Sequence, residues 1–212
     1  MTRLRALLRV AALGVQGALL VAFPLLVHAG VSRFGARRTA IALGVLVLPS
    51  LLRAAAQGRA RLASALALPA TAAALLALAA ALDDGRFMLA YPALVNAALL
   101  ARFGLSLRGE RPFVEDLARL SVPDLSPEER RYCRSVTVVW CGFFTANGAA
   151  AALLAAFAPR GWWAAYTGVV SYVLIGIVFS AEYVVRKARF GRFGRGPVDR
   201  LLAAHLRRPA AG

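Results

Sequence analysis

Charged residues are scarce in this sequence of 212 residues, at 17% of the chain, whereas a soluble domain usually carries about a quarter. Lys occurs once, at Lys187, while 60% of the residues are hydrophobic. The few charges are also segregated, because clusters of Arg separate long uncharged runs. A charge at the centre of a bilayer is costly. The pattern therefore excludes an ordinary soluble domain and predicts an all-α, polytopic transmembrane helix bundle.

Cysteine and histidine are equally rare, with two of each. Cys133 and Cys141 point in different directions on a helix, and no His or acidic residue completes a metal set around them. We interpret both as structural. The sequence shows no catalytic triad, phosphate loop or zinc spacing. It therefore predicts no metal, no cofactor and no catalytic residue, and it favours a non-enzymatic role without deciding the question.

The net charge of +16 raises the possibility of a nucleic-acid partner. The basic residues lie mostly at the ends of apolar runs, however, and cytoplasmic flanks of membrane helices carry such residues. We therefore expect no nucleic-acid partner.

The apolar runs predict about six spans in a single membrane domain, residues 1–212. The spans cover about residues 10–30, 38–56, 62–82, 87–107, 135–158 and 162–185. The first run is longer than the roughly 7–15 apolar residues of a signal peptide, which favours an uncleaved anchor over a cleaved leader. The second run is the weakest, and its alternative is a segment that dips in without crossing. Trp162 and Trp163 are expected to mark a membrane interface.

Two polar segments complete the chain. The first is a cytoplasmic amphipathic loop, residues 108–134, in which Phe113, Leu117 and Leu120 share one helical face and which offers a site for a protein partner. Ser126 and Glu129 have capping-box spacing, which predicts a helix from Pro127 into the fifth span. The second is the basic cytoplasmic tail, residues 186–212, which is expected to bind anionic lipid headgroups.

Orientation follows from the distribution of positive charge. The acidic turn at residues 83–86 and the turn at residues 159–161 carry few cations, whereas the 53–61 and 108–134 connections and the tail carry many. The positive-inside rule then places both termini in the cytoplasm. One connection, around Arg37 and Arg38, goes against the rule in this topology.

Three polar side chains are predicted to lie near the middle of spans: Asn96, Asn147 and Tyr172. If their helices are neighbours, the three can meet at one depth and hydrogen-bond one another. Such contacts usually hold helices together. A substrate site is the alternative, because polar groups inside a membrane are costly.

A second candidate site is a boundary charge cluster at the cytoplasmic ends of the last three spans. Glu182 can pair with Arg186 four residues later, and Arg102 and Arg134 are expected at the same depth. The favoured role of this cluster is to tie helix ends together. The alternatives are a proton relay or a pocket for a lipid headgroup.

Several motifs of the C-terminal sixty per cent of the chain resemble a family of bacterial inner-membrane proteins that are often encoded among aryl-polyene and type II fatty-acid-like synthesis genes. They are the segments 91–96, 103–107, 139–144, 147–148, 162–163 and 182–186. A more distant similarity is to the intracellular septation protein A family, in which an acidic turn and an Asn within the fifth span recur in the same order. The resemblance implies a location and a pathway, and it implies no reaction.

Two functions are compatible with these features. The first is a non-enzymatic scaffold that holds envelope or biosynthetic machinery at the membrane. The second is a carrier or flippase-like protein for a lipid or acyl-aryl product, and it depends on the intramembrane polar residues. A membrane-bound acyl-modifying enzyme is a third hypothesis, for which no reactive group is identifiable.

Overall fold

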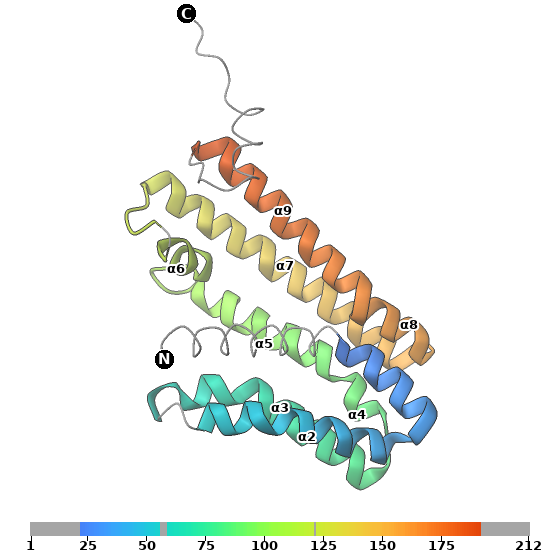
Figure 1. Cartoon of the computed structure of the whole chain (residues 1–212). Coiled ribbons are helices and arrows are strands. Elements are labelled where there is room, and N and C mark those ends of the chain that lie inside the picture. Colours follow the sequence, from blue (N-terminus) through green and yellow to red (C-terminus); the bar gives the residue numbers. More distant parts are fainter. Residues whose placement is uncertain (1–21, 56–58, 121, 192–212) are drawn as a thin grey trace, which may run out of the picture. The chain divides into compact units, whose positions relative to one another are not determined.

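The computed structural model describes residues 22–55, 59–120 and 122–191, and within these ranges the chain is all-helical (Figure 1). A helix over residues 22–34 comes first. It is followed by α2 (Ala36–Ala55), α3 (Arg59–Leu82), α4 (Arg86–Leu89), α5 (Tyr91–Ser106), α6 (Phe113–Arg119), α7 (Pro127–Phe157), α8 (Arg160–Ala165), the π-helix η1 (Tyr166–Val170) and α9 (Ser171–Phe190).

Three helical segments are long and apolar enough to cross a membrane. They are Arg86–Ser106, Pro127–Phe157 and Arg160–Phe190, which match the last three of the six predicted spans. Within α3, residues 70–82 form a shorter apolar helical stretch. Most of the first predicted span lies outside the described residues, so the six-span arrangement stays a prediction. The all-helical fold class is confirmed.

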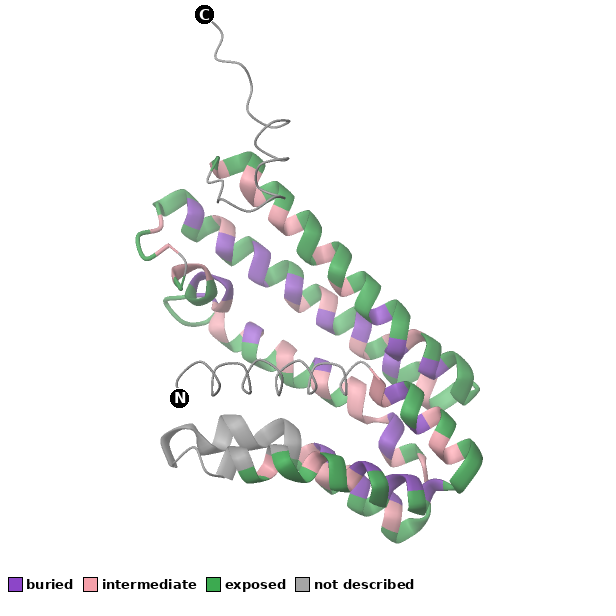
Figure 2. Cartoon of the chain, viewed as in Figure 1, coloured by how far each residue is buried: buried purple, intermediate pink, exposed green. Residues whose placement is uncertain are grey.

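Few residues of these three segments are buried in the protein, and the segment that ends with α9 is the most exposed of them (Figure 2). In the most apolar 18 residues of each segment, only 22%, 22% and 11% of the residues are buried, in chain order. In α9, Val173, Ile177 and Phe179 are each more than half exposed. Apolar surface of this extent is rare on soluble monomers and indicates a membrane or protein interface.

The chain divides into two compact units, which are described separately. The first comprises the described residues up to 101 together with residues 141–172. Its α2 and α3 pack against each other (Figure 1). Ala36, Ala40 and Leu43 of α2 are buried with Leu76 and Ala79 of α3. Small side chains at such a contact let two helix backbones approach closely.

An acidic turn connects α3 to α4, as expected, and it also caps α2. Asp83 has a positive φ of 52°, and its carboxylate accepts a 2.9 Å hydrogen bond from the backbone N–H of Arg37. The N–H groups in the first turn of a helix have no partner within the helix. Arg37 returns the contact, because its Nε donates to the Ala80 carbonyl at 3.0 Å. The turn therefore links the start of α2 to the end of α3.

The fourth predicted span is interrupted between α4 and α5. Pro92 has no N–H for the usual helical bond four residues back. At this break the Leu89 carbonyl accepts a 3.2 Å hydrogen bond from Nε1 of Trp163. Trp163 is fully buried in the core of the first unit, whereas Trp162 is 71% exposed. The expectation that both Trp residues lie at an interface is therefore wrong for Trp163.

The second unit comprises residues 102–140 and the described residues from 173 onward. Here α7 and α9 lie side by side (Figure 1). Trp140 packs on Phe179 with ring centroids 4.6 Å apart, and nearer the other end Tyr132 packs on Phe190 at 5.4 Å. Aromatic pairs at these separations stabilise the contact beyond their buried area.

The start of α7 confirms the predicted capping box. The backbone N–H of Ser126 donates to Glu129 Oε2 at 2.8 Å, and the backbone N–H of Glu129 donates to Ser126 Oγ at 3.2 Å. The helix then runs for 31 residues from Pro127 without a break.

The last helix extends further than the sequence suggested. The sixth span was placed at residues 162–185 and the basic tail from residue 186, but α9 continues to Phe190 and ends at Gly191, whose φ is 62°. Glycine adopts this conformation without steric cost. The remainder of the predicted tail, residues 192–212, lies outside the described residues.

The cap at Asp83 predicts a specific loss of stability. Asp83→Ala removes the acceptor for the Arg37 N–H and places alanine at a positive φ. We expect the free energy of unfolding in detergent micelles to fall by about 1–2 kcal/mol. Asp83→Asn keeps a side-chain oxygen and tolerates the backbone conformation, so it should cost much less. Equal losses in thermal unfolding of the two variants would contradict the capping role.

Candidate functional site

Two of the three predicted intramembrane polar residues are in direct contact. Nδ2 of Asn147 on α7 donates a 3.0 Å hydrogen bond to Oδ1 of Asn96 on α5. Both side chains are buried, with 8% of Asn96 and 5% of Asn147 exposed. Nδ2 of Asn96 in turn donates to the Pro92 carbonyl at 2.8 Å. The pair therefore joins α5 to α7 within the first unit.

The third partner of this pair is a tyrosine that the sequence analysis did not select. The Tyr166 hydroxyl donates to Asn147 Oδ1 at 3.0 Å. Tyr172, which was expected in this place, is 37% exposed. The prediction compared only the positions of residues along their helices. A tyrosine hydroxyl lies several ångströms from its own Cα atom, so Tyr166 can reach Asn147 from a different depth. The π-helix of residues 166–170 also changes the phase of the helical faces beyond it.

The resulting chain of hydrogen bonds runs from Tyr166 through Asn147 and Asn96 to Pro92. Gly148 adds to the contact, because a Cβ atom at this position would lie 2.9 Å from Cβ of Asn96. A glycine next to the buried Asn pair lets α5 and α7 approach closely. Since each amide group is satisfied by a neighbour, the geometry fits a packing role.

The predicted boundary charge cluster is only partly assembled. Nη2 of Arg186 lies 2.6 Å from Oε1 of Glu182, as the spacing suggested. Arg102 and Arg134 make other contacts. The guanidinium of Arg102 lies 4.9 Å from the ring centroid of Phe113, and Nη2 of Arg134 donates to the Leu107 carbonyl at 2.7 Å. The expected ring of arginines around Glu182 is therefore wrong.

Tyr132 completes the surroundings of the Glu182–Arg186 pair. Its hydroxyl donates a long 3.4 Å hydrogen bond to the Glu182 backbone carbonyl, and the Arg186 guanidinium lies 5.5 Å from its ring centroid. These contacts connect α7 to α9. They support the interpretation that the charges tie helix ends together.

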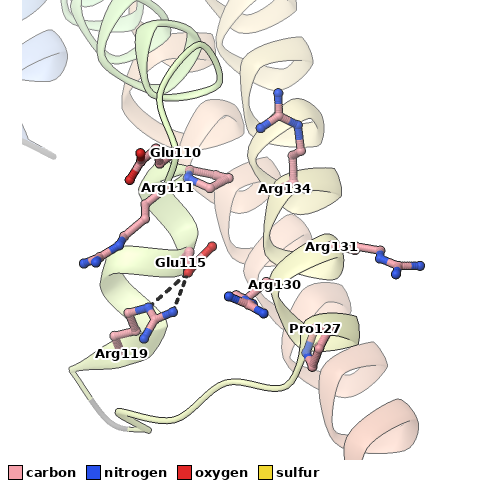
Figure 3. A pocket seen from close by; sticks show the side chains of 9 residues that line it. Glu110, Arg111, Glu115, Arg119, Pro127, Arg130, Arg131 and Arg134 are labelled. Carbon is pink, nitrogen blue, oxygen red and sulfur yellow. Dashed lines mark hydrogen bonds and ion pairs between the residues drawn. The ribbon is translucent and has the colours of Figure 1, made fainter.

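A cleft of about 470 Å³ lies between α6 and the first turns of α7, within the second unit (Figure 3). This volume is within the range of about 300–1,000 Å³ that is typical of ligand sites. Most of the charged side chains that line it are basic: they are Arg111, Arg119, Arg130, Arg131 and Arg134, with Glu110 and Glu115.

The wall that α6 contributes is electrostatically neutral near its centre. Glu115 is 3% exposed, and its Oε1 accepts hydrogen bonds from Arg119 at 3.0 Å from Nε and 2.8 Å from Nη2. The remaining nitrogen of Arg119, Nη1, donates to the Pro123 carbonyl at 2.9 Å. The charges of Glu115 and Arg119 thus compensate each other.

The wall that α7 contributes carries charge without such compensation. Figure 3 shows the Arg130 side chain pointing from α7 into the space that faces α6. Among the described residues, Arg130 has no ion-pair partner. Arg134 lies one turn further along the same face of α7.

The sequence predicts Arg134 as a site residue and gives no such signal for Arg130. Arg130 follows the capping box directly, and five of the eight residues from Pro127 to Arg134 are charged, so no local signal separates one Arg from the next. Only the packing of α6 against α7 distinguishes the arginine that faces the cleft. No three His, Cys, Asp or Glu side chains of the described ranges gather into a metal-binding group.

No protein-family model, curated protein or solved structure matches the chain. The resemblance to inner-membrane proteins of aryl-polyene gene clusters and to the septation protein A family therefore stays a prediction.

The hydrogen bond between Tyr166 and Asn147 can be tested by a double-mutant cycle. Tyr166→Phe should lower the free energy of unfolding by about 0.6 kcal/mol, with an upper bound of about 1.7 kcal/mol, as for other hydrogen bonds between membrane helices. In an Asn147→Ala background the same substitution should cost almost nothing, because its partner is gone. Unfolding in mixed micelles measures both effects. An unchanged cost in that background would show that the bond contributes nothing.

Proposed function

We propose that the chain is a multi-pass protein of the bacterial inner membrane that acts as a non-enzymatic scaffold for envelope or biosynthetic machinery. In this proposal six helices cross the membrane and both termini lie in the cytoplasm. The scaffold is the folded segment of residues 106–134, which the membrane helices hold at the cytoplasmic surface.

The distribution of charge supports this orientation. The ends of α5 and α9 and the start of α7 carry many basic residues, among them Arg108, Arg130, Arg131 and Arg189. The connections at the other ends of these helices contain one arginine each, Arg86 and Arg160. Positive charge favours the cytoplasmic side.

The observation that carries the proposal is the way in which α6 is held in place. The backbone N–H of Phe113 donates to Ser106 Oγ at 2.9 Å, and that of Val114 lies 3.4 Å from Thr137 Oγ1. The rings of Phe103 and Phe113 are 4.5 Å apart. These contacts join α6 to the end of α5 and to α7. A polar connection with no role beyond its length would not need them.

The opposite side of α6 is open. Leu117 is 50% exposed and Leu120 is 84% exposed, next to the exposed carboxylate of Asp116. An ordered helix that presents apolar side chains beside a charge is a suitable contact for a partner protein or for the membrane interface.

The carrier hypothesis rests on the buried Asn96–Asn147 pair. The hydrogen bonds of this pair to Tyr166 and to the Pro92 carbonyl occupy the groups that a substrate would need. A carrier would have to break these bonds during each cycle. The scaffold is therefore the function that this geometry supports better.

The scaffold can be tested by photo-crosslinking in living cells. A photoreactive amino acid in place of Leu120 should capture a discrete protein partner, because this side chain points outward from an anchored helix. The matched control is the same amino acid in place of Leu153, which is 59% exposed on the apolar part of α7 and should give no protein adduct.

A loop replacement makes the test decisive. Residues 108–125 are exchanged for a neutral Gly/Ser linker of the same length, which keeps the capping box and α7. The adduct and the cellular phenotype of the intact protein should both be lost. Cells in which the linker variant is present at normal level and fully active would sink the scaffold proposal.

A further inference from the structure

Two like charges on one face of α7 remain uncompensated by the protein. Arg130 and Arg134 are four residues apart, and like charges at this spacing destabilise a helix. Arg134 donates a hydrogen bond to the neutral Leu107 carbonyl. Arg130 has no carboxylate partner within the described ranges. A bound anion between the two guanidinium groups would remove the repulsion.

The opposite wall of the cleft does not supply that anion. Two carboxylates line the cleft: Glu115 is buried and already paired with Arg119, and Glu110 forms no ion pair with Arg130 or Arg134. Figure 3 shows this pair on α6 across from Arg130. The cleft therefore combines a neutral wall with a basic one, and its volume of about 470 Å³ leaves room for a ligand.

The position of the two arginines along α7 indicates where the ligand would come from. The apolar part of α7 begins at Val136. With a rise of about 1.5 Å per residue, Arg134 lies about 3 Å and Arg130 about 9 Å before it. The headgroup layer on each side of a bilayer is about 5–8 Å thick. In the proposed orientation Arg134 thus lies within the headgroup layer and Arg130 just beyond it, so the cleft is within reach of lipid phosphates.

We propose that the cleft between α6 and α7 binds a phosphate group of an anionic ligand through Arg130 and Arg134. Guanidinium groups suit this ligand because their planar donors form paired, charge-assisted hydrogen bonds with phosphate oxygens. A lipid headgroup and a free phosphate share this chemistry. The site goes beyond the scaffold role and does not depend on it.

Binding can be measured with the full chain in an uncharged detergent at fixed ionic strength. Isothermal titration uses two probes, short-chain phosphatidylglycerol below its micelle concentration and inorganic phosphate. We expect phosphatidylglycerol to bind more tightly, because its glycerol group can use the rest of the cleft. Arg130→Gln should raise its Kd about tenfold or more, as expected for a lost charge-assisted hydrogen bond.

A nearby arginine provides the matched control. Arg108→Gln removes the same charge from the exposed connection between α5 and α6, but Arg108 does not line the cleft. The Kd of this variant for phosphatidylglycerol should stay within about twofold of the Kd of the intact protein, since only long-range, salt-screened attraction is lost. Thermal unfolding without ligand should be the same for both variants, which shows that they are folded.

Each outcome decides the proposal. Tighter binding of phosphatidylglycerol than of phosphate, lost in Arg130→Gln alone, supports a lipid headgroup. Equal binding of both probes with the same dependence on Arg130 supports a free phosphate at the same site. Absence of binding, or equal weakening by Arg130→Gln and Arg108→Gln, overturns the proposal, because the attraction would then lack a defined site.

Discussion

Apolar surface that the protein does not cover is the constraint on which the structure depends. Most of the apolar side chains in α7 and α9 face outward, and in α9 the only buried residue is Ser171. In water this arrangement would leave a large apolar area exposed. In hydrocarbon the same side chains are solvated, and helices satisfy their backbone hydrogen bonds internally. Three segments are long and apolar enough to cross a membrane, and hydrocarbon would solvate the side chains that the protein leaves uncovered.

The polar groups follow from the same constraint. Where Asn96, Asn147 and Tyr166 lie within the helices, each is bonded to a neighbour. Some charges outside these helices are paired or cap helix ends, as Glu115 and Glu129 show. Arg130 has no carboxylate partner among the described residues, and it points into a cleft (Figure 3). For this reason the cleft is the place where the structure points to a ligand.

Sequence reasoning could predict features that local signals specify. The composition indicated helices in a membrane, the Ser126–Glu129 spacing indicated the start of α7, and the depth of Asn96 and Asn147 indicated their contact. It failed where side-chain direction and nonlocal packing decide, since Tyr166 and not Tyr172 reaches the Asn pair and the docking of α6 selects Arg130. Hydropathy also could not show that Trp163 is buried, because an interfacial Trp has the same sequence pattern.

Labelling with a photoactivatable lipid tests the central claim most directly. The full chain is reconstituted in liposomes that contain a carbene-forming lipid, and the modified residues are mapped by mass spectrometry. Hydrocarbon contact predicts labelling along α9 at Val173, Ile177 and Val184, and none at Arg131. If these positions of α9 stayed unlabelled by the lipid but reacted with a water-soluble carbene probe, the outward apolar surface would face water and the account would be contradicted.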